Sequence, residues 1–233
     1  MRVLIDRNRI FFLWRGGVSL LLFLWVTGCA QVLPLAAIAP TAVHFGSVAY
    51  QSVERAQIDV VVSPGIAQED LGAITHVAIV MGGESRTRPY GRIGDLASVV
   101  GDNLSVELAR LGFQVHNWNR TGEDAHKVAI QTLAEEGKTR GAQAVVTGNV
   151  AAGHTRSLGM FGVGGFKTVV QSATLRVIDV KTSTLLLMIT INYRVGQSPK
   201  VAAEGMAMVL QAKLEDPSGD LREQLREKMR EKT

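Results

Sequence analysis

The sequence predicts a single α/β domain in which helices flank a mixed β-sheet. Residues 76–150 alternate between short apolar runs and amphipathic stretches, in the order strand, helix, strand, helix, strand. Residues 166–195 then carry two long strand-rich runs, and residues 201–214 return to helical spacing. Strands joined by helices lie parallel and hairpin strands lie antiparallel, so these segments together indicate a sheet of mixed direction.

Apolar spacing defines the first elements. Residues 58–62 predict a short strand, and the turn residues 63–65 follow it. Residues 76–81 are almost all apolar, which is typical of a strand buried on both faces, and we expect this strand near the centre of the sheet. From residue 93 to residue 111 apolar side chains recur at helical spacing, which predicts a helix that Gly112 ends.

A second helix and two strands complete the alternation. Residues 113–118 alternate as a strand, and residues 142–150 form the next apolar run. Between them, Thr121 and Asp124 resemble a capping box, which predicts a helix from there to about Glu136.

The final third of the chain is strand-rich and then helical. Residues 166–180 and 183–195 predict two strands that form a hairpin at the edge of the sheet. Residues 201–214 predict a helix, which ends before the turn at 217–219. Residues 220–232 alternate acids and bases beside a thin apolar line of Leu221, Leu225 and Met229. The alternatives for this last helix are a solvated surface helix and docking through the apolar line.

The N-terminal segment has the layout of a secretory signal. Arginines surround the first apolar residues, and an uninterrupted apolar run of about a dozen residues follows Arg15. A transmembrane helix needs about 20 such residues, so this run is too short to span a membrane. The next residues, Val26, Thr27, Gly28 and Cys29, resemble the bacterial lipobox, in which a peptidase cuts before a cysteine that carries a diacylglyceryl group. The alternative is a buried free cysteine.

Cys29 is the only cysteine in the chain, so the mature protein has no disulfide and packing alone must hold its fold. Ala30 follows it rather than an aspartate, which favours the periplasmic face of the outer membrane over the inner membrane. We therefore expect four segments: a signal peptide at 1–28, a lipidated N-terminus and tether at 29–55, an α/β domain at 56–216 and a charged C-terminal helix at 217–233. Within the tether, the alternatives for residues 43–45 and 48–50 are an edge strand and docking on the domain.

The positive charge of the chain lies mainly in the targeting segment. The formal net charge of the whole chain is +4, and residues 1–28 hold four arginines and one aspartate, a net of +3 that leaves +1 for the remainder. This balance lacks the basic footprint of a nucleic-acid-binding protein. We expect no nucleic-acid partner.

No catalytic or metal-binding motif is complete. Residues 137–139 resemble the end of a phosphate-binding loop, but Thr132 stands where that loop needs its first glycine, and we expect a helix terminus instead. No Gly-x-Ser-x-Gly elbow occurs. The histidines lack metal-ligand spacing; they are His44, His76, His116, His126 and His154. We expect no enzymatic activity, no metal and no cofactor apart from the covalent lipid on Cys29.

One predicted binding loop follows the buried strand at 76–81. Residues 82–91 leave the carboxyl end of that strand, where α/β proteins place their ligands. The side chains suited to binding are those of Arg86, Arg88 and Tyr90.

A second predicted contact site has an unusual local composition. Residues 158–166 combine four glycines with the apolar side chains of Met160, Phe161, Val163 and Phe166. An exposed apolar loop of this kind predicts contact with a partner or a membrane. The alternative is a glycine-rich turn that folds onto the core.

Four segments together resemble the CsgG-type family of bacterial lipoproteins: residues 76–81, 108–115, 141–150 and 175–182. They follow a lipobox in the family's order and spacing. The family includes the curli secretion lipoprotein CsgG and, in a similar fold, LpoB, an activator of peptidoglycan synthases, and its fold is related to the amino-terminal domain of TolB. The resemblance implies a compact α/β domain that acts by protein contact in the periplasm.

Two classes of function follow from the residues and the resemblance. The first is an assembly or scaffolding lipoprotein of envelope or secretion machinery, either as a homo-oligomer or in contact with other envelope proteins. The second is a regulator that docks on a periplasmic enzyme such as a peptidoglycan synthase, which the short tether disfavours. A curli-type pore subunit is less favoured, because the 13 residues from His154 to Phe166 cannot supply two membrane hairpins.

Overall fold

The structure is a computed structural model, which describes residues 39–83, 93–118, 128–157 and 165–231. The chain divides into two compact units, residues 1–42 and 43–233. Apart from the first turn of helix α2 (Ala39–Glu54), all of the described residues belong to the second unit.

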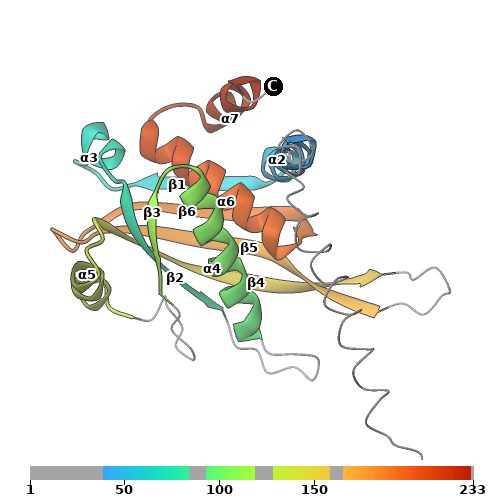
Figure 1. Cartoon of the computed structure of the whole chain (residues 1–233), viewed down its shortest axis with the longest axis horizontal. Helices are drawn as coiled ribbons and strands as arrows, with labels where there is room; N and C mark the ends of the chain where they lie inside the picture. The colour runs from blue at the N-terminus through green and yellow to red at the C-terminus, as the bar shows by residue number, and fades with distance from the viewer. Residues whose placement is uncertain (1–38, 84–92, 119–127, 158–164, 232–233) are drawn as a thin grey trace, which may run out of the picture. The chain divides into compact units, whose positions relative to one another are not determined.

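The second unit is built on one six-stranded mixed sheet with helices on both faces (Figure 1). Across the sheet the strand order is β1-β6-β5-β4-β2-β3. Strand β2 pairs in parallel with β3 and with β4, and the remaining pairs are antiparallel. The strands are β1 (Gln57–Val62), β2 (His76–Gly83), β3 (Gln114–Asn117), β4 (Ala144–Ser157), β5 (Gly165–Asp179) and β6 (Leu185–Gln197). The predicted α/β fold with a mixed sheet is confirmed.

Strand β2 is buried on both faces because its residues alternate between two cores. Val77 and Ile79 lie in the main core with helix α4 (Ile93–Arg110), whereas Ala78 and Val80 lie in a smaller core with helix α5 (Ile130–Thr139). Successive strand residues point to opposite faces, so α4 and α5 cover opposite faces of the sheet. The prediction of a doubly buried strand is confirmed, but only β3 separates β2 from the sheet edge.

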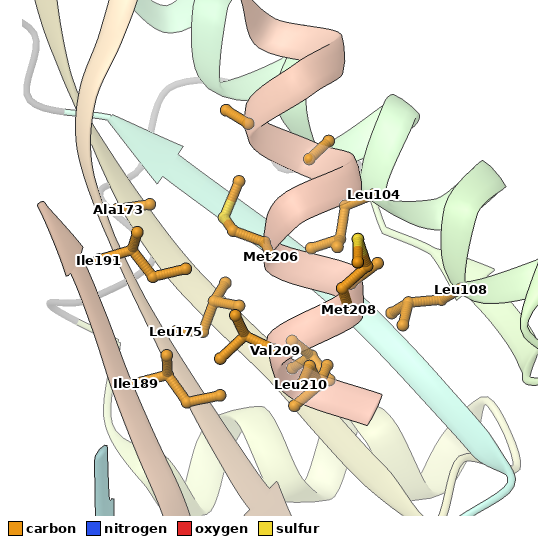
Figure 2. Close-up of a cluster of buried hydrophobic side chains, with 14 of the residues drawn as sticks. Leu104, Leu108, Ala173, Leu175, Ile189, Ile191, Met206, Met208, Val209 and Leu210 are labelled. Atoms are coloured by element: carbon orange, nitrogen blue, oxygen red, sulfur yellow. The ribbon is translucent and has the colours of Figure 1, made fainter. Parts of the chain in front are cut away.

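Helix α6 (Pro199–Glu215) occupies the middle of the main core (Figure 2). Its N-terminus is fixed by Ser198, whose hydroxyl accepts a hydrogen bond from the Val201 nitrogen at 3.3 Å, and by Pro199 in the first turn. The side chains buried around it come from α6 itself, from α4 and from the sheet: Met206, Val209, Leu210, Leu104, Leu108, Leu175, Ile189 and Ile191. The predicted helix at 201–214 is confirmed.

Helix α2 occupies residues for which the sequence predicted a tether. Ala49 and Val53 are buried in the main core, and Gly205 of α6 lets the two helices approach, since a Cβ at Gly205 would lie 2.6 Å from Cγ2 of Val53. The apolar side of α2 is short and packs on residues distant in the sequence, including Gly205 of α6, so the local pattern does not predict a helix. The folded domain thus begins before residue 56, and residues 48–50 belong to a docked helix.

Helix α5 begins later than predicted. It starts at Ile130, and its N-cap residue, Ala129, supplies no side-chain hydrogen bond. Thr121 and Asp124 lie outside the described residues and precede this start by several positions, so they do not cap α5. The helix ends at Thr139, which confirms that residues 137–139 are a helix terminus. A short helix that the sequence did not predict, α3 (Gln68–Gly72), precedes β2.

Strands β5 and β6 form the predicted hairpin, but not at the sheet edge. Asp179 shapes its turn, because its carboxylate accepts a hydrogen bond from the Thr182 nitrogen at 2.9 Å. Strand β1 lies beyond β6, with Val60 opposite Ile189, and β4 lies beyond β5. The hairpin therefore lies in the middle of the sheet.

The C-terminal helix α7 (Leu221–Glu231) docks on the domain through its apolar line. Leu225 is 2% exposed in the main core, and Leu221 and Met229 pack against it. An ion pair joins Lys228 Nζ to Glu215 Oε2 at 2.6 Å. Docking is thus the alternative that the structure shows for this helix.

The turn between α6 and α7 is held by charged groups. Lys213, only 4% exposed, donates to the Gly219 carbonyl oxygen at 2.6 Å. The Asp216 carboxylate accepts from the Gly219 nitrogen at 2.9 Å, and the Asp220 carboxylate accepts from the Arg222 nitrogen at 2.8 Å. Hydrogen bonds from Ser218 and Gly219 lower the pKa of Asp216, and hydrogen bonds from Glu223 and Arg222 lower the pKa of Asp220.

We predict that Gly205→Ala destabilises the domain through overlap with Val53. Overpacking of this kind costs about 1–3 kcal/mol, which exceeds the gain of up to about 1 kcal/mol from alanine's better helix propensity. Urea unfolding of the single variant, of Val53→Ala and of the double variant measures the coupling. In the Val53→Ala background, Gly205→Ala should lower the free energy of unfolding by less than it does in the wild-type protein. Strictly additive losses would contradict close packing of α2 on α6.

We also predict that α7 leaves the domain in acid before the main core unfolds. The lowered pKa values of Asp216 and Asp220 mean that their stabilising effect is complete above the ordinary aspartate value of 3.8 and is lost as the pH falls through the lower folded-state values. NMR signals of the Leu225 methyl groups, followed from neutral pH downward, report the release, and those of Ile189 serve as the control. Simultaneous loss of both sets of signals would count against this prediction.

Candidate functional site

Strands β4 and β5 continue beyond the rest of the sheet as a two-stranded arm (Figure 1). Strand β2 pairs with β4 only as far as Val150, and β6 pairs with β5 only as far as Val170. Past these points β4 and β5 pair with each other alone, out to Ser157 opposite Gly165. We call residues 152–157 and 165–169 the β4–β5 arm. At about 3.3 Å per residue its longer strand extends roughly 20 Å.

A β-bulge lies at the base of the arm. The register shifts between Ala151 and Ala152, so that Gln171 has no partner residue in either neighbouring strand. Gly153 leaves room for the Gln171 side chain, which a Cβ at this position would overlap. Bulges bend a strand and increase its twist, so this one sets the direction in which the arm leaves the sheet.

The arm carries positive charge and no acidic residue. Between residues 151 and 172 the charged residues are Arg156 and Lys167, His154 can also become cationic, and no aspartate or glutamate occurs. The side chains of His154 and Lys167 are exposed. Among the described residues, no third strand covers either edge of the arm, so backbone donors and acceptors along both edges are free to pair.

Three polar side chains near the base of the arm bury atoms that have no hydrogen-bond partner. The atoms are Thr147 Oγ1 and Asn149 Oδ1 of β4 and Arg176 Nη2 of β5. Thr147 lies directly opposite Arg176, and Asn149 follows two residues along β4, so all three share one face of the sheet. Val145 on the same face belongs to the smaller core, which identifies it as the face that α5 partly covers. We call these three residues the buried polar cluster.

Strand β2, which the predicted binding loop follows in the sequence, ends beside this cluster. Strand β2 ends at Gly83, and Gly82 pairs with Asn149 of the cluster. Arg86, Arg88 and Tyr90 themselves lie outside the described residues. The described end of β2 thus lies beside the buried polar cluster, which no motif in the sequence indicates.

In the sequence, the predicted contact loop connects the two strands of the arm. Met160, Phe161 and Val163 are outside the described residues, and Phe166 lies in β5, paired with Arg156. The sequence predicts strands that end at residue 150 and resume at residue 166, whereas β4 continues to Ser157 and β5 begins at Gly165. The stretch at 154–157 is polar and has no apolar alternation, so the local pattern does not predict a strand there.

The lipobox lies outside the part of the chain that the structure describes. This applies to Val26, Thr27, Gly28 and Cys29 alike. Their assignment as cleavage site and lipidation site stays a prediction.

Two cavities elsewhere have polar walls that already serve the fold. The larger, of about 790 Å³, lies beside the β5–β6 turn and is lined in part by Gln143 and Asp179. Gln143 Oε1 accepts from the Thr75 nitrogen at 2.7 Å, and Asp179 shapes the turn. The smaller, of about 270 Å³, lies where α2, β1 and α7 meet.

Among the described residues, neither a metal-binding group nor a membrane-spanning helix occurs. The described residues include no group of three or more His, Cys, Asp or Glu placed to hold a metal ion. None of the helices described here combines the length and apolar character needed to cross a membrane.

No protein-family model matches the chain, and no curated protein matches it. Similar solved structures include the PelC dodecamer from Paraburkholderia phytofirmans, with 18% identity and a TM-score of 0.38 over 66% of this chain and 94% of that one. A PelC variant dodecamer from the same organism has 18% identity and a TM-score of 0.37, over 65% and 96%. A DUF4136 family protein from Bacteroides thetaiotaomicron has 8% identity and a TM-score of 0.34, over 69% and 97%. These values describe a distant similarity.

Proposed function

We propose that this protein is a non-enzymatic lipoprotein on the periplasmic face of the outer membrane, where it acts by protein–protein contact in the assembly or scaffolding of envelope or secretion machinery. The four sequence segments at 76–81, 108–115, 141–150 and 175–182 support a place in the CsgG-type group. The observation that carries the contact role is the β4–β5 arm.

The arm supports this role because a two-stranded ribbon is marginally stable on its own in water. Its unpaired backbone edges are a template for a third strand, and strand addition is a recurrent way to bind an extended segment of a partner. Arg156 and Lys167 without any neighbouring acid favour a partner surface that is acidic. A second copy of this chain and another envelope protein are the two partners that fit.

The length of the tether supports a partner at the same membrane. Helix α2 starts at Ala39, so only residues 30–38 separate it from Cys29. Fully extended, these residues reach about 30 Å. A regulator of an inner-membrane synthase would need a longer reach, so assembly or scaffolding at the outer membrane is the better supported class.

The anchor itself is proposed to be the lipid on Cys29. Each buried methylene of an acyl chain contributes about 0.8 kcal/mol to membrane binding, and two or more chains make the attachment firm. Cys29→Ser should therefore abolish the incorporation of labelled palmitate and leave an uncleaved precursor, measured by autoradiography and by mass spectrometry. Cys29→Ser that is still labelled and cleaved would contradict the lipobox assignment.

Site-specific photo-crosslinking in intact cells tests the contact role. A photoreactive residue at His154 or Lys167 of the arm should give discrete crosslinked species, either with an envelope protein or with a second copy of this chain. Val106 is a matched control, because it is 50% exposed and lies on helix α4 rather than on the arm. Equal crosslinking from Val106, or capture of cytoplasmic proteins alone, would contradict the proposed function.

A further inference from the structure

The buried polar cluster is energetically costly in the free protein. A buried polar atom without a hydrogen bond destabilises the fold by about 1–3 kcal/mol, and native structures contain only a few such atoms. Here three of them occur side by side: Thr147 Oγ1, Asn149 Oδ1 and Arg176 Nη2. Thr147 is completely buried, whereas Asn149 and Arg176 are partly exposed, so the cluster reaches solvent on one side.

The chemistry of the cluster is that of a site for one anionic oxygen group. A guanidinium presents paired N–H donors that match a carboxylate, and a threonine hydroxyl adds a third donor. The amide of Asn149 can turn either its oxygen or its nitrogen toward a ligand, because the two ends are nearly equal in shape. One cation balances one carboxylate, whereas a phosphate dianion would leave a negative charge uncompensated in a partly buried site.

The neighbours of the cluster suit an apolar group attached to that carboxylate. Val80 of β2 lies beside Thr147, and Met188 of β6 lies beside Arg176. Trp118 packs in the same small core as Val80 and is 6% exposed. Val80 and Trp118 are themselves buried, whereas Met188 is half-buried, so an apolar group that leaves the carboxylate can contact Met188 on this face of the sheet.

We infer that Thr147, Asn149 and Arg176 form a binding site for the carboxylate of a ligand that carries an apolar group. The site lies at the carboxyl end of β2, where open α/β sheets bind ligands. Two sources share this chemistry, the C-terminal carboxylate of a peptide and a free short-chain carboxylic acid. The inference is independent of the β4–β5 arm and of the lipid anchor.

Binding is tested with the protein purified in detergent from its native membranes, at constant ionic strength. Isothermal titration calorimetry with butyrate should show saturable binding, and butyramide, which lacks the charge, should show none. N-acetyl-trialanine with a free carboxylate and the same peptide as its amide distinguish the two sources. Tighter binding of the free-carboxylate peptide than of butyrate assigns the site to peptide termini, and the reverse assigns it to small acids. Failure of both carboxylates to bind would overturn the inference.

Variants separate a binding role from a structural one. Arg176→Met and the nearly isosteric Thr147→Val should each weaken carboxylate binding, by about tenfold or more for Arg176→Met, because a hydrogen bond to a charged group is lost. Both should raise the urea midpoint of the free protein, since each removes an unpaired buried polar atom. Arg194→Met, which alters an exposed arginine of β6, should change neither property.

A fall in the urea midpoint of both variants would show that their polar groups are already satisfied by other parts of this chain, and it would overturn the inference. Carboxylate binding that survives in both variants would do the same. Because the crosslinking from His154 and Lys167 does not involve these residues, failure of this test leaves the proposed function to be judged by its own experiment.

Discussion

Strands β4 and β5 pair along their whole length, from Ala144 opposite Asp179 to Ser157 opposite Gly165. One β-bulge interrupts this ladder. This ladder joins the two halves of the sheet, since β2 and β3 lie parallel on the β4 side and β6 and β1 lie antiparallel on the β5 side. The buried polar cluster lies near its middle and the arm at its end. A change in its register would move all of these features at once, because a slip of one residue turns every side chain to the other face.

The two faces of the sheet are covered to different extents, and this difference places the candidate sites. One face is buried beneath α4 and α6, with α2 and α7 packed beside them in the main core. The other has α5 over the small core, and away from it the strands present polar side chains, of which Asp59 and Asn192 are exposed and Thr174 and Thr190 are half-buried. Antiparallel strands tolerate one solvated face, so stability comes mainly from the helical side. Polar groups on the other side are thereby available for binding.

The sequence predicted those helices and strands whose apolar residues are regularly spaced within the segment itself. The strand at 76–81 and the helix at 93–111 were predicted nearly to their observed limits. A strand buried on both faces is a continuous apolar run, and a helix buried on one face has apolar residues at every third or fourth position. The predicted position of the hairpin at the sheet edge is wrong because β1 pairs beyond β6. This pairing, for example of Val60 with Ile189, joins residues far apart in the sequence, so local pattern does not indicate it. The sequence predicts a tether where the structure has helix α2, because the residues on which α2 packs, such as Gly205 of α6, lie far along the chain.

The candidate sites were less predictable from the sequence than the fold, because strand pairing brings their residues together from distant parts of the chain. The composition of residues 158–166 predicts a contact loop, but it does not indicate that the strands on either side of this loop extend beyond the rest of the sheet. The polar cluster exists only because the register sets Arg176 opposite Thr147, and each residue alone is ordinary for a sheet.

Hydrogen exchange of the arm amides, at residues 152–157 and 165–169, tests the central claim most directly. In the purified protein these amides should exchange much faster than those of residues 144–150, which have strands on both sides. In native membranes, where the partner is present, they should become protected. Equal exchange in both preparations would contradict a partner-binding arm.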